Sequence, residues 1–273
     1  MTALTKSLLC VTGLPHAGST ILCELLGQHP KLYSPGDVSP LCPTLMGMRQ
    51  QLSRDPLVLA QVERDGVEGH RRSRSAFQGF VNGWFDALPQ PWVVDQHQNW
   101  MLQLQLLQLI DPHSRVLVCV RELGQVWGSI EEQYRRKLPL DFPNSFADLS
   151  PLDRAERLFG EGMVGEALRS LEAIQDHSAE LQSRLYYVVF EHLISNPQEV
   201  IQDIYNWLAL PAIAVDSQDS PISSAVNTLN SNTLHASLEA FSLHAVPPRI
   251  HKLIQGNFRW YYNLFYPGLL SGG

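Results

Sequence analysis

The segment LLCVTGLPHAGSTILCELLGQHP, residues 8–30, decides the fold of this chain. The apolar run 8–12 predicts a buried strand, and the turn that follows it leads into a helical pattern over residues 19–28. Backbone N–H groups in such a turn point inward, and the helix start adds partial positive charge, so the turn suits a phosphate-like anion. Taken by itself, the segment also fits a plain strand–helix turn in which the glycines serve geometry alone.

The rest of the chain repeats this order of strand and helix. Three more apolar runs of strand length are each followed by a helical pattern; the runs are residues 92–94, 116–120 and 186–190, and the helical patterns are residues 100–110, 124–136 and 198–208. Near-continuous apolar strands that alternate with helices predict a three-layer α/β/α fold with a central parallel sheet. Ligands of such sheets bind at the carboxyl ends of the strands. A single domain over residues 1–273 is the simplest account.

Other segments carry weaker patterns. Residues 46–88 are expected to be helical and include the basic stretch 70–74, which is either a solvated face or a place for an acidic group. Residues 138–151 and 210–231 are expected to form loops, and the aromatic residues 249–267 a closing helix. The segments 46–88 and 138–151 are the ones expected to line an acceptor pocket.

Composition excludes several classes of protein. The net charge of −7 argues against a general nucleic-acid binder. No apolar run approaches the roughly 20 residues that cross a bilayer, so we expect no stable membrane insertion. The four cysteines form no CxxC pair, which predicts buried free thiols, no metal site and a reducing cytoplasm.

The turn has the G-x-x-x-x-G spacing of a P-loop between Gly13 and Gly18, with one important difference. Ser19 stands where an ATPase or GTPase needs lysine, so a P-loop kinase-like enzyme is only a weak alternative. The one basic side chain inside the turn is His16.

A second strand–turn–helix segment, RVLVCVRELGQVWGSIEEQYRR, spans residues 115–136. Arg121 follows the strand at its carboxyl end, where a guanidinium can grip a phosphate with two hydrogen bonds. Ser129 comes about two helical turns later and can add a hydroxyl. A surface arginine paired with Glu122 is the alternative interpretation.

Together these two segments resemble the sulfotransferase family, which transfers a sulfuryl group from 3′-phosphoadenosine 5′-phosphosulfate (PAPS). The family's first loop typically reads P-[RK]-S-G-[ST]-T, and its second segment reads V-R-D-x(6)-S. The stretches VVFEHLISNPQEVIQDIYNWLALP (residues 188–211), VVDQHQNW (93–100) and the aromatic end of the chain are also similar to family patterns. The corresponding residues here are Pro15-His16-Ala17-Gly18-Ser19-Thr20 and Val120-Arg121-Glu122 with Ser129.

The resemblance implies a role for each matching residue. It implies that residues 15–20 bind the 5′-phosphosulfate and that Arg121 and Ser129 bind the 3′-phosphate. Phe190 takes the place of the family tyrosine that stacks on adenine. The implied reaction needs no metal, and its acceptor is a hydroxyl or amine of a small molecule, a glycan or a lipid. A homo-oligomer is compatible with all of this.

The chain departs from the family where the chemistry occurs. His16 replaces a loop arginine or lysine, and Gln96 replaces the lysine expected after the motif's aspartate. Asp37 matches the glutamate that acts as base in the branch that modifies protein tyrosines, and His97 is a second candidate base. We therefore expect Asp37, His16, His97 and Gln96 at the catalytic centre.

These departures keep two hypotheses open. One is a PAPS-dependent sulfotransferase, and the other is a module of the same fold that binds PAPS or adenosine bisphosphate without catalysis. Each residue also has a simpler interpretation: Asp37 as a turn residue, His97 as a surface histidine and His16 as a solvent-facing turn side chain.

Overall fold

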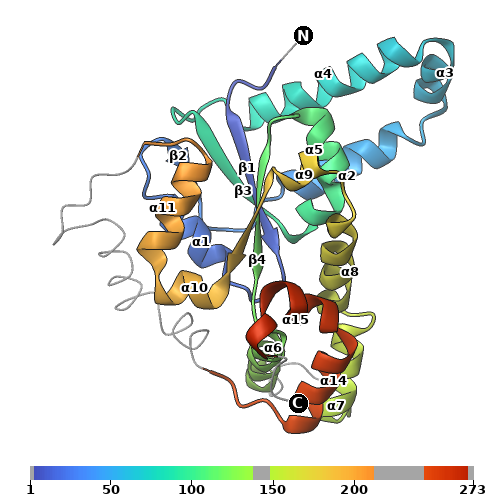
Figure 1. Cartoon of the computed structure of the whole chain (residues 1–273). Helices are drawn as coiled ribbons and strands as arrows, with labels where there is room; N and C mark the ends of the chain where they lie inside the picture. The colour runs from blue at the N-terminus through green and yellow to red at the C-terminus, as the bar shows by residue number, and fades with distance from the viewer. Residues whose placement is uncertain (1–2, 138–147, 212–242, 270–273) are drawn as a thin grey trace. The chain divides into compact units, whose positions relative to one another are not determined.

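The structure is a computed structural model that describes residues 3–137, 148–211 and 243–269 (Figure 1). Five strands form one sheet in the order β2-β3-β1-β4-β5, flanked by helices. The α/β fold with a central parallel sheet is therefore confirmed. The strands are β1 (Ser7–Gly13), β2 (Leu32–Tyr33), β3 (Trp92–Gln96), β4 (Arg115–Val120) and β5 (Leu185–Val189).

Four of the five strands lie where the apolar runs predicted them. Strand β1 is almost completely buried from its second residue onward, because helices cover both faces of a parallel sheet. Strand β2 was not predicted, since two residues are too few to show a periodicity. Phe190, expected at the end of the last strand, instead begins helix α10 (Phe190–Ser195).

The register of β1 and β3 aligns the ends of the two strands. They pair in parallel, with Ser7 opposite Trp92 and Val11 opposite Gln96. A further parallel bridge joins Val38 to Gln96. The backbone of Gln96, the last residue of β3, is therefore paired with Val11 on one side and with Val38 on the other. This pairing fixes the position from which its side chain extends.

The first of two compact units comprises Met1–Thr12, Ser19–Leu117 and Ala179–Tyr186. The predicted helical segment 46–88 is confirmed as three helices, of which α3 and α4 pack on each other. The predicted helix 100–110 is divided into η1 and α5. The helices of the first unit are α1 (Ser19–Leu26), α2 (Leu41–Leu52), α3 (Pro56–Arg64), α4 (Gly66–Trp84), η1 (Gln98–Gln103), α5 (Leu104–Ile110) and α9 (Ala179–Gln182).

The second unit comprises Gly13–Gly18, Val118–Ser178 and Tyr187–Gly273. The aromatic end of the chain forms two helices that break at Phe258, where one helix was expected. Of the loops expected at 138–151 and 210–231, residues 138–147 and 212–231 lie outside the described residues, and Pro151 begins a helix instead. The single domain stays a prediction. Besides α10, the helices are α6 (Leu123–Lys137), α7 (Pro151–Phe159), α8 (Met163–Gln175), α11 (Pro197–Trp207), α14 (Pro248–Asn257), α15 (Arg259–Phe265) and η2 (Pro267–Leu269).

All four cysteines are buried free thiols, as predicted. Burial raises the pKa of Cys23 and of Cys42 to about 12, so neither thiol ionises readily near neutral pH. In the described part of the chain, no helix combines the length and the apolar character needed to cross a membrane.

Candidate functional site

The glycine turn between β1 and α1 is held tightly against strand β4. Gly13 has φ +136°, and a Cβ atom there would lie 2.1 Å from the backbone oxygen of Cys119. The Leu14 N–H donates a 2.9 Å hydrogen bond to the same oxygen. His16 has φ +58°, a left-handed conformation that is uncommon outside glycine. The turn therefore depends on glycine at its first position and carries local strain at His16.

Arg121 follows β4 and reaches directly into this turn. Its Nη1 donates a 2.9 Å hydrogen bond to the backbone oxygen of His16, and the side chain is 3% exposed. Burial lowers the pKa of Arg121, and the nearby acids Glu191 and Glu122 oppose that shift. An arginine stays charged in spite of such a shift, so a buried positive charge lies against the glycine turn. The adjacency expected from the sequence is present.

Ser129, on α6, also meets the turn. Its Oγ lies 2.8 Å from Nδ1 of His16. The basic side chain of the turn is thus bound to the serine that the resemblance implies for the 3′-phosphate. His16, Arg121 and Ser129 form what we call the turn cluster, and all three belong to the second unit.

The ring of Phe190 covers one side of this cluster. Its centroid lies 4.2 Å from Cζ of Arg121, within the range of a cation–π contact. A Cβ atom on Gly18 would lie 2.5 Å from Cδ2 of the same ring. Glycine at position 18 therefore leaves room for the ring. The ring is 5% exposed, and its stacking on adenine stays a prediction.

Tyrosines of α15 fix the backbone around Arg121. The Tyr261 hydroxyl donates to the Arg121 carbonyl oxygen at 2.8 Å and accepts from the Arg121 N–H at 3.2 Å. The Tyr262 hydroxyl donates to Glu122, whose own N–H donates to Glu191. Glu122 is thus engaged by hydrogen-bond donors from α15 and from its own helix, and the aromatic end of the chain positions the arginine.

The segment after residue 242 adds a contact that the sequence did not suggest. His244 forms two hydrogen bonds with the Gln125 side chain through its backbone, and its Nδ1 lies 3.0 Å from a carboxylate oxygen of Glu132. A Cβ atom on Gly128 would lie 2.2 Å from that of His244, so glycine is required there. No sequence signal marked this contact, because His244 lies far along the chain in a segment without periodicity.

A second group of polar side chains lies in the first unit. Gln96 Nε2 donates to Ser19 Oγ at 2.8 Å and approaches Thr20 Oγ1 at 3.4 Å. Gln96 is 6% exposed, and its Oε1 is buried with no hydrogen-bond partner among the described residues. Because Ser19 accepts this bond, its own O–H proton is available to a ligand. We call Gln96, Ser19 and Thr20 the amide cluster.

In the motif VVDQHQNW, Asp95 and Trp100 have a structural role. Trp100 donates from Nε1 to Oδ1 of Asp95 at 2.7 Å, and both side chains are buried. Burial raises the pKa of Asp95, while hydrogen bonds from Ser39 and Trp100 oppose that shift. This pair fixes the direction of the chain as it leaves β3 and so helps to place Gln96.

His97 has a structural task as well. Its Nδ1 accepts a 3.1 Å hydrogen bond from the Asn99 N–H and caps η1. Burial lowers the pKa of His97, which favours the neutral ring that such a cap needs. One ring nitrogen is therefore already used, and a role for His97 as base stays a prediction.

Asp37 lies beside the amide cluster with a partner that sequence analysis missed. It precedes Val38, the residue that bridges to Gln96, and its side chain is exposed. The pKa of Glu24 on α1 is raised by desolvation and then by the charge of Asp37. The charge of Asp37 thus acts on Glu24. Glu24 lies four residues after Thr20, and this helical spacing places both on one face of α1.

Each of the two units contains donors that suit a phosphate-like anion. The turn cluster offers a guanidinium, an imidazole and a hydroxyl, and the amide cluster offers two hydroxyls oriented by an amide. Charged donors bind phosphate oxygens more strongly than neutral ones do. Among the described residues, no cluster of His, Cys, Asp or Glu is suited to holding a metal ion.

Comparison with known proteins indicates the family of the chain. The sequence profile of the sulfotransferase family matches residues 9–214. No curated protein matches the chain in sequence.

Solved structures resemble the fold over most of the chain. A sulfotransferase domain from the curacin biosynthetic pathway has 16% identity and a TM-score of 0.53, covering 94% of this chain and 98% of its own. Sulfotransferase STF9 from Mycobacterium avium has 16% identity and a TM-score of 0.55, covering 97% and 78%. A sulfotransferase from Alicyclobacillus acidocaldarius has 15% identity and a TM-score of 0.50, covering 87% and 96%. At such identities these likenesses show the fold alone.

Proposed function

Because this chain belongs to the sulfotransferase family, we propose that it transfers a sulfuryl group from PAPS to a hydroxyl or amine acceptor. The observation that carries the proposal is the turn cluster. A buried arginine and a serine from the segment 115–136 meet a histidine of the glycine turn. Charge-assisted hydrogen bonds from such donors suit phosphate oxygens.

The proposed binding roles follow from these contacts. Arg121 and Ser129 take the 3′-phosphate, and residues 15–20 take the phosphosulfate through backbone N–H groups and the hydroxyls of Ser19 and Thr20. His16 contacts Ser129, so we assign it to the 3′-phosphate. Phe190 supports the adenosine through its packing on Arg121.

The chemistry needs a proton acceptor and a donor to the leaving oxygen. Transfer replaces the bond between sulfur and the bridging phosphate oxygen by a bond from sulfur to the acceptor atom, and the acceptor's proton passes to a base. We propose Asp37 as that base. Its charge helps to raise the pKa of the neighbouring Glu24, which favours the neutral form of Glu24. Gln96 orients the Ser19 hydroxyl so that its proton can stabilise the leaving oxygen.

A binding module of the same fold is the second candidate, and one observation favours it. Gln96 brings no positive charge, although one oxyanion donor is worth about 3 kcal/mol of transition-state stabilisation. The P-loop kinase-like alternative has less support, because Ser19 occupies the lysine position and is bound by Gln96. Buried thiols without disulfides suit a reducing compartment, so the cytoplasm remains our proposed location.

Calorimetric titration with adenosine 3′,5′-bisphosphate tests the ligand. We expect saturable binding that Arg121→Ala weakens by about 100-fold, because a doubly hydrogen-bonded charged contact contributes roughly 3 kcal/mol. Arg259→Ala is the matched control, since Arg259 is exposed at the start of α15 in the same unit. Equal affinities of the two variants would remove the basis for the nucleotide site.

Transfer of radiolabelled sulfate from PAPS then separates enzyme from binding module. The acceptors to test are phenols, sugars and lipid alcohols, with and without Asp37→Asn. Label on one acceptor class, lost in the variant, supports the enzyme and identifies the class. Tight nucleotide binding with no labelled acceptor supports the binding module.

A further inference from the structure

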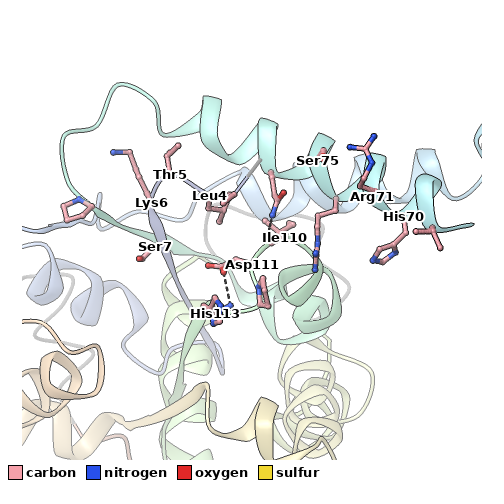
Figure 2. Close-up of a pocket in the computed structure, with 16 residues that line it drawn as sticks. Leu4, Thr5, Lys6, Ser7, His70, Arg71, Ser75, Ile110, Asp111 and His113 are labelled. Carbon is pink, nitrogen blue, oxygen red and sulfur yellow. Dashed lines mark hydrogen bonds between the residues drawn. The ribbon is translucent and has the colours of Figure 1, made fainter. Parts of the chain in front are cut away.

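The first unit contains a cavity of about 670 Å³ that the proposed reaction does not use (Figure 2). Its walls come from the residues before β1, from α4 and from the turn between α5 and β4. It therefore lies where β1 begins, whereas the amide cluster lies where β1 and β3 end. Its volume is within the usual range of small-molecule sites, about 300–1,000 Å³.

The cavity is lined by positive side chains that carbonyl oxygens hold in place. Lys6 Nζ donates to the backbone oxygens of Leu88 and Gln90, and Arg74 Nε donates to that of Leu109 at 2.9 Å. These acceptors are neutral, so they orient the cations without compensating their charge. Within residues 3–137, 148–211 and 243–269, neither Lys6 nor Arg74 forms an ion pair.

Other charged groups at the cavity leave this excess in place. Arg71 is paired with Glu68, while His70 and His113 also face the cavity. Asp111 is the acidic residue of the lining, and its Oδ1 accepts a 2.9 Å hydrogen bond from the His113 N–H. The lining is thus positive in a chain whose net charge is −7.

The rest of the lining is largely apolar. Leu4 and Ile110 lie on the walls, and Val67 at the start of α4 is 84% exposed. Gln78 donates to the Ile110 backbone oxygen at 2.8 Å and so ties α4 to the end of α5. A lining that combines cationic and apolar side chains suits a ligand that has a negative group and an apolar body.

We propose that this cavity binds a small amphipathic anion, with a single carboxylate or sulfate group and an apolar body. The negative group pairs with Arg74, and the apolar body lies against apolar lining residues such as Ile110. A half-buried guanidinium gains from such a partner, because charged hydrogen bonds are strongest at sites that exclude water. The proposal does not depend on the sulfuryl-transfer function.

Calorimetric titration of the whole chain with decanoate, below the concentration at which it forms micelles, tests this site. We expect saturable binding with one ligand per chain. Arg74→Gln should weaken it by at least about tenfold, and Arg74→Lys should restore most of it because the charge returns. Arg72→Gln is the matched control, since Arg72 is on the same helix, pairs with Glu68 and does not line the cavity.

Further measurements separate this site from the alternatives. Arg74→Lys keeps a donor and a positive charge at this position, so its recovery of binding shows that the loss in Arg74→Gln comes from the missing charge and not from a folding defect. Saturating adenosine 3′,5′-bisphosphate should leave decanoate binding unchanged, because the turn cluster is a different site. The proposal would be overturned if decanol bound as tightly as decanoate, or if Arg72→Gln and Arg74→Gln had equal effects. The absence of saturable binding would also overturn it.

Discussion

Replacing Gly13 by alanine tests the turn that carries the proposed function. A Cβ atom at this position would lie 2.1 Å from the backbone oxygen of Cys119 and 2.5 Å from its nitrogen. Both are backbone atoms of a strand, so neither can rotate away as a flexible side chain can. The φ of +136° is also one that alanine rarely adopts.

The expected cost follows from three contributions. A non-glycine residue in a disfavoured backbone region costs about 1–3 kcal/mol. Loss of the hydrogen bond between the Leu14 N–H and the Cys119 oxygen adds about 1 kcal/mol, and displacement of β4 adds a similar amount or more. We expect a total of about 3–5 kcal/mol, a large share of the roughly 5–15 kcal/mol that keeps a typical protein folded.

Urea unfolding and thermal unfolding, both followed by circular dichroism, measure this loss of stability. The melting temperature should fall by about 10 °C, given roughly 2–4 °C per kcal/mol for a chain of this size. Gly47→Ala is the control, because Gly47 lies inside α2 and a Cβ atom there meets nothing within 4 Å. It should raise stability by about 0.5–1 kcal/mol. A Gly13→Ala protein as stable as the unmodified chain would refute the close approach of turn and strand.

Three further predictions concern the polar groups of the first unit. Gln96→Leu removes the hydrogen-bond donor to Ser19 but keeps a side chain of similar volume. Sulfuryl transfer should therefore slow by about 100-fold, while the affinity for adenosine bisphosphate changes little. An unchanged rate of transfer would exclude Gln96 from catalysis. His97→Asn keeps a good helix cap, so turnover should hardly change, and a large loss would instead identify His97 as the base. Because the pKa of Glu24 is raised in the folded state, the folded state loses stability as pH rises above the ordinary pKa of a glutamate side chain. Glu24→Gln should therefore stabilise the protein at about pH 7 but not at about pH 4. Unfolding midpoints check this, and an equal effect at both pH values would show that Asp37 and burial do not act on Glu24.

Several features of the fold and of the turn cluster were open to prediction because they depend on neighbours in sequence. The apolar run before Gly13 could only be a buried strand, and the spacing of eight residues from Arg121 to Ser129 placed both near one helix start. The break of the closing segment at Phe258 and the short strand β2 had no local signal. Their formation depends on packing partners distant in the chain.

The residue types of the site were set by the sequence itself: a lysine is absent after Gly18, and a histidine and a glutamine stand where the family carries cations. Tertiary structure alone decided what those residues touch. It directed His16 to Ser129, which is 113 residues away in sequence. It also brought Glu24 under the influence of Asp37. The physical reason is that hydrogen bonds and charges act over a few ångströms in space, and only the folded backbone determines which distant residues come that close.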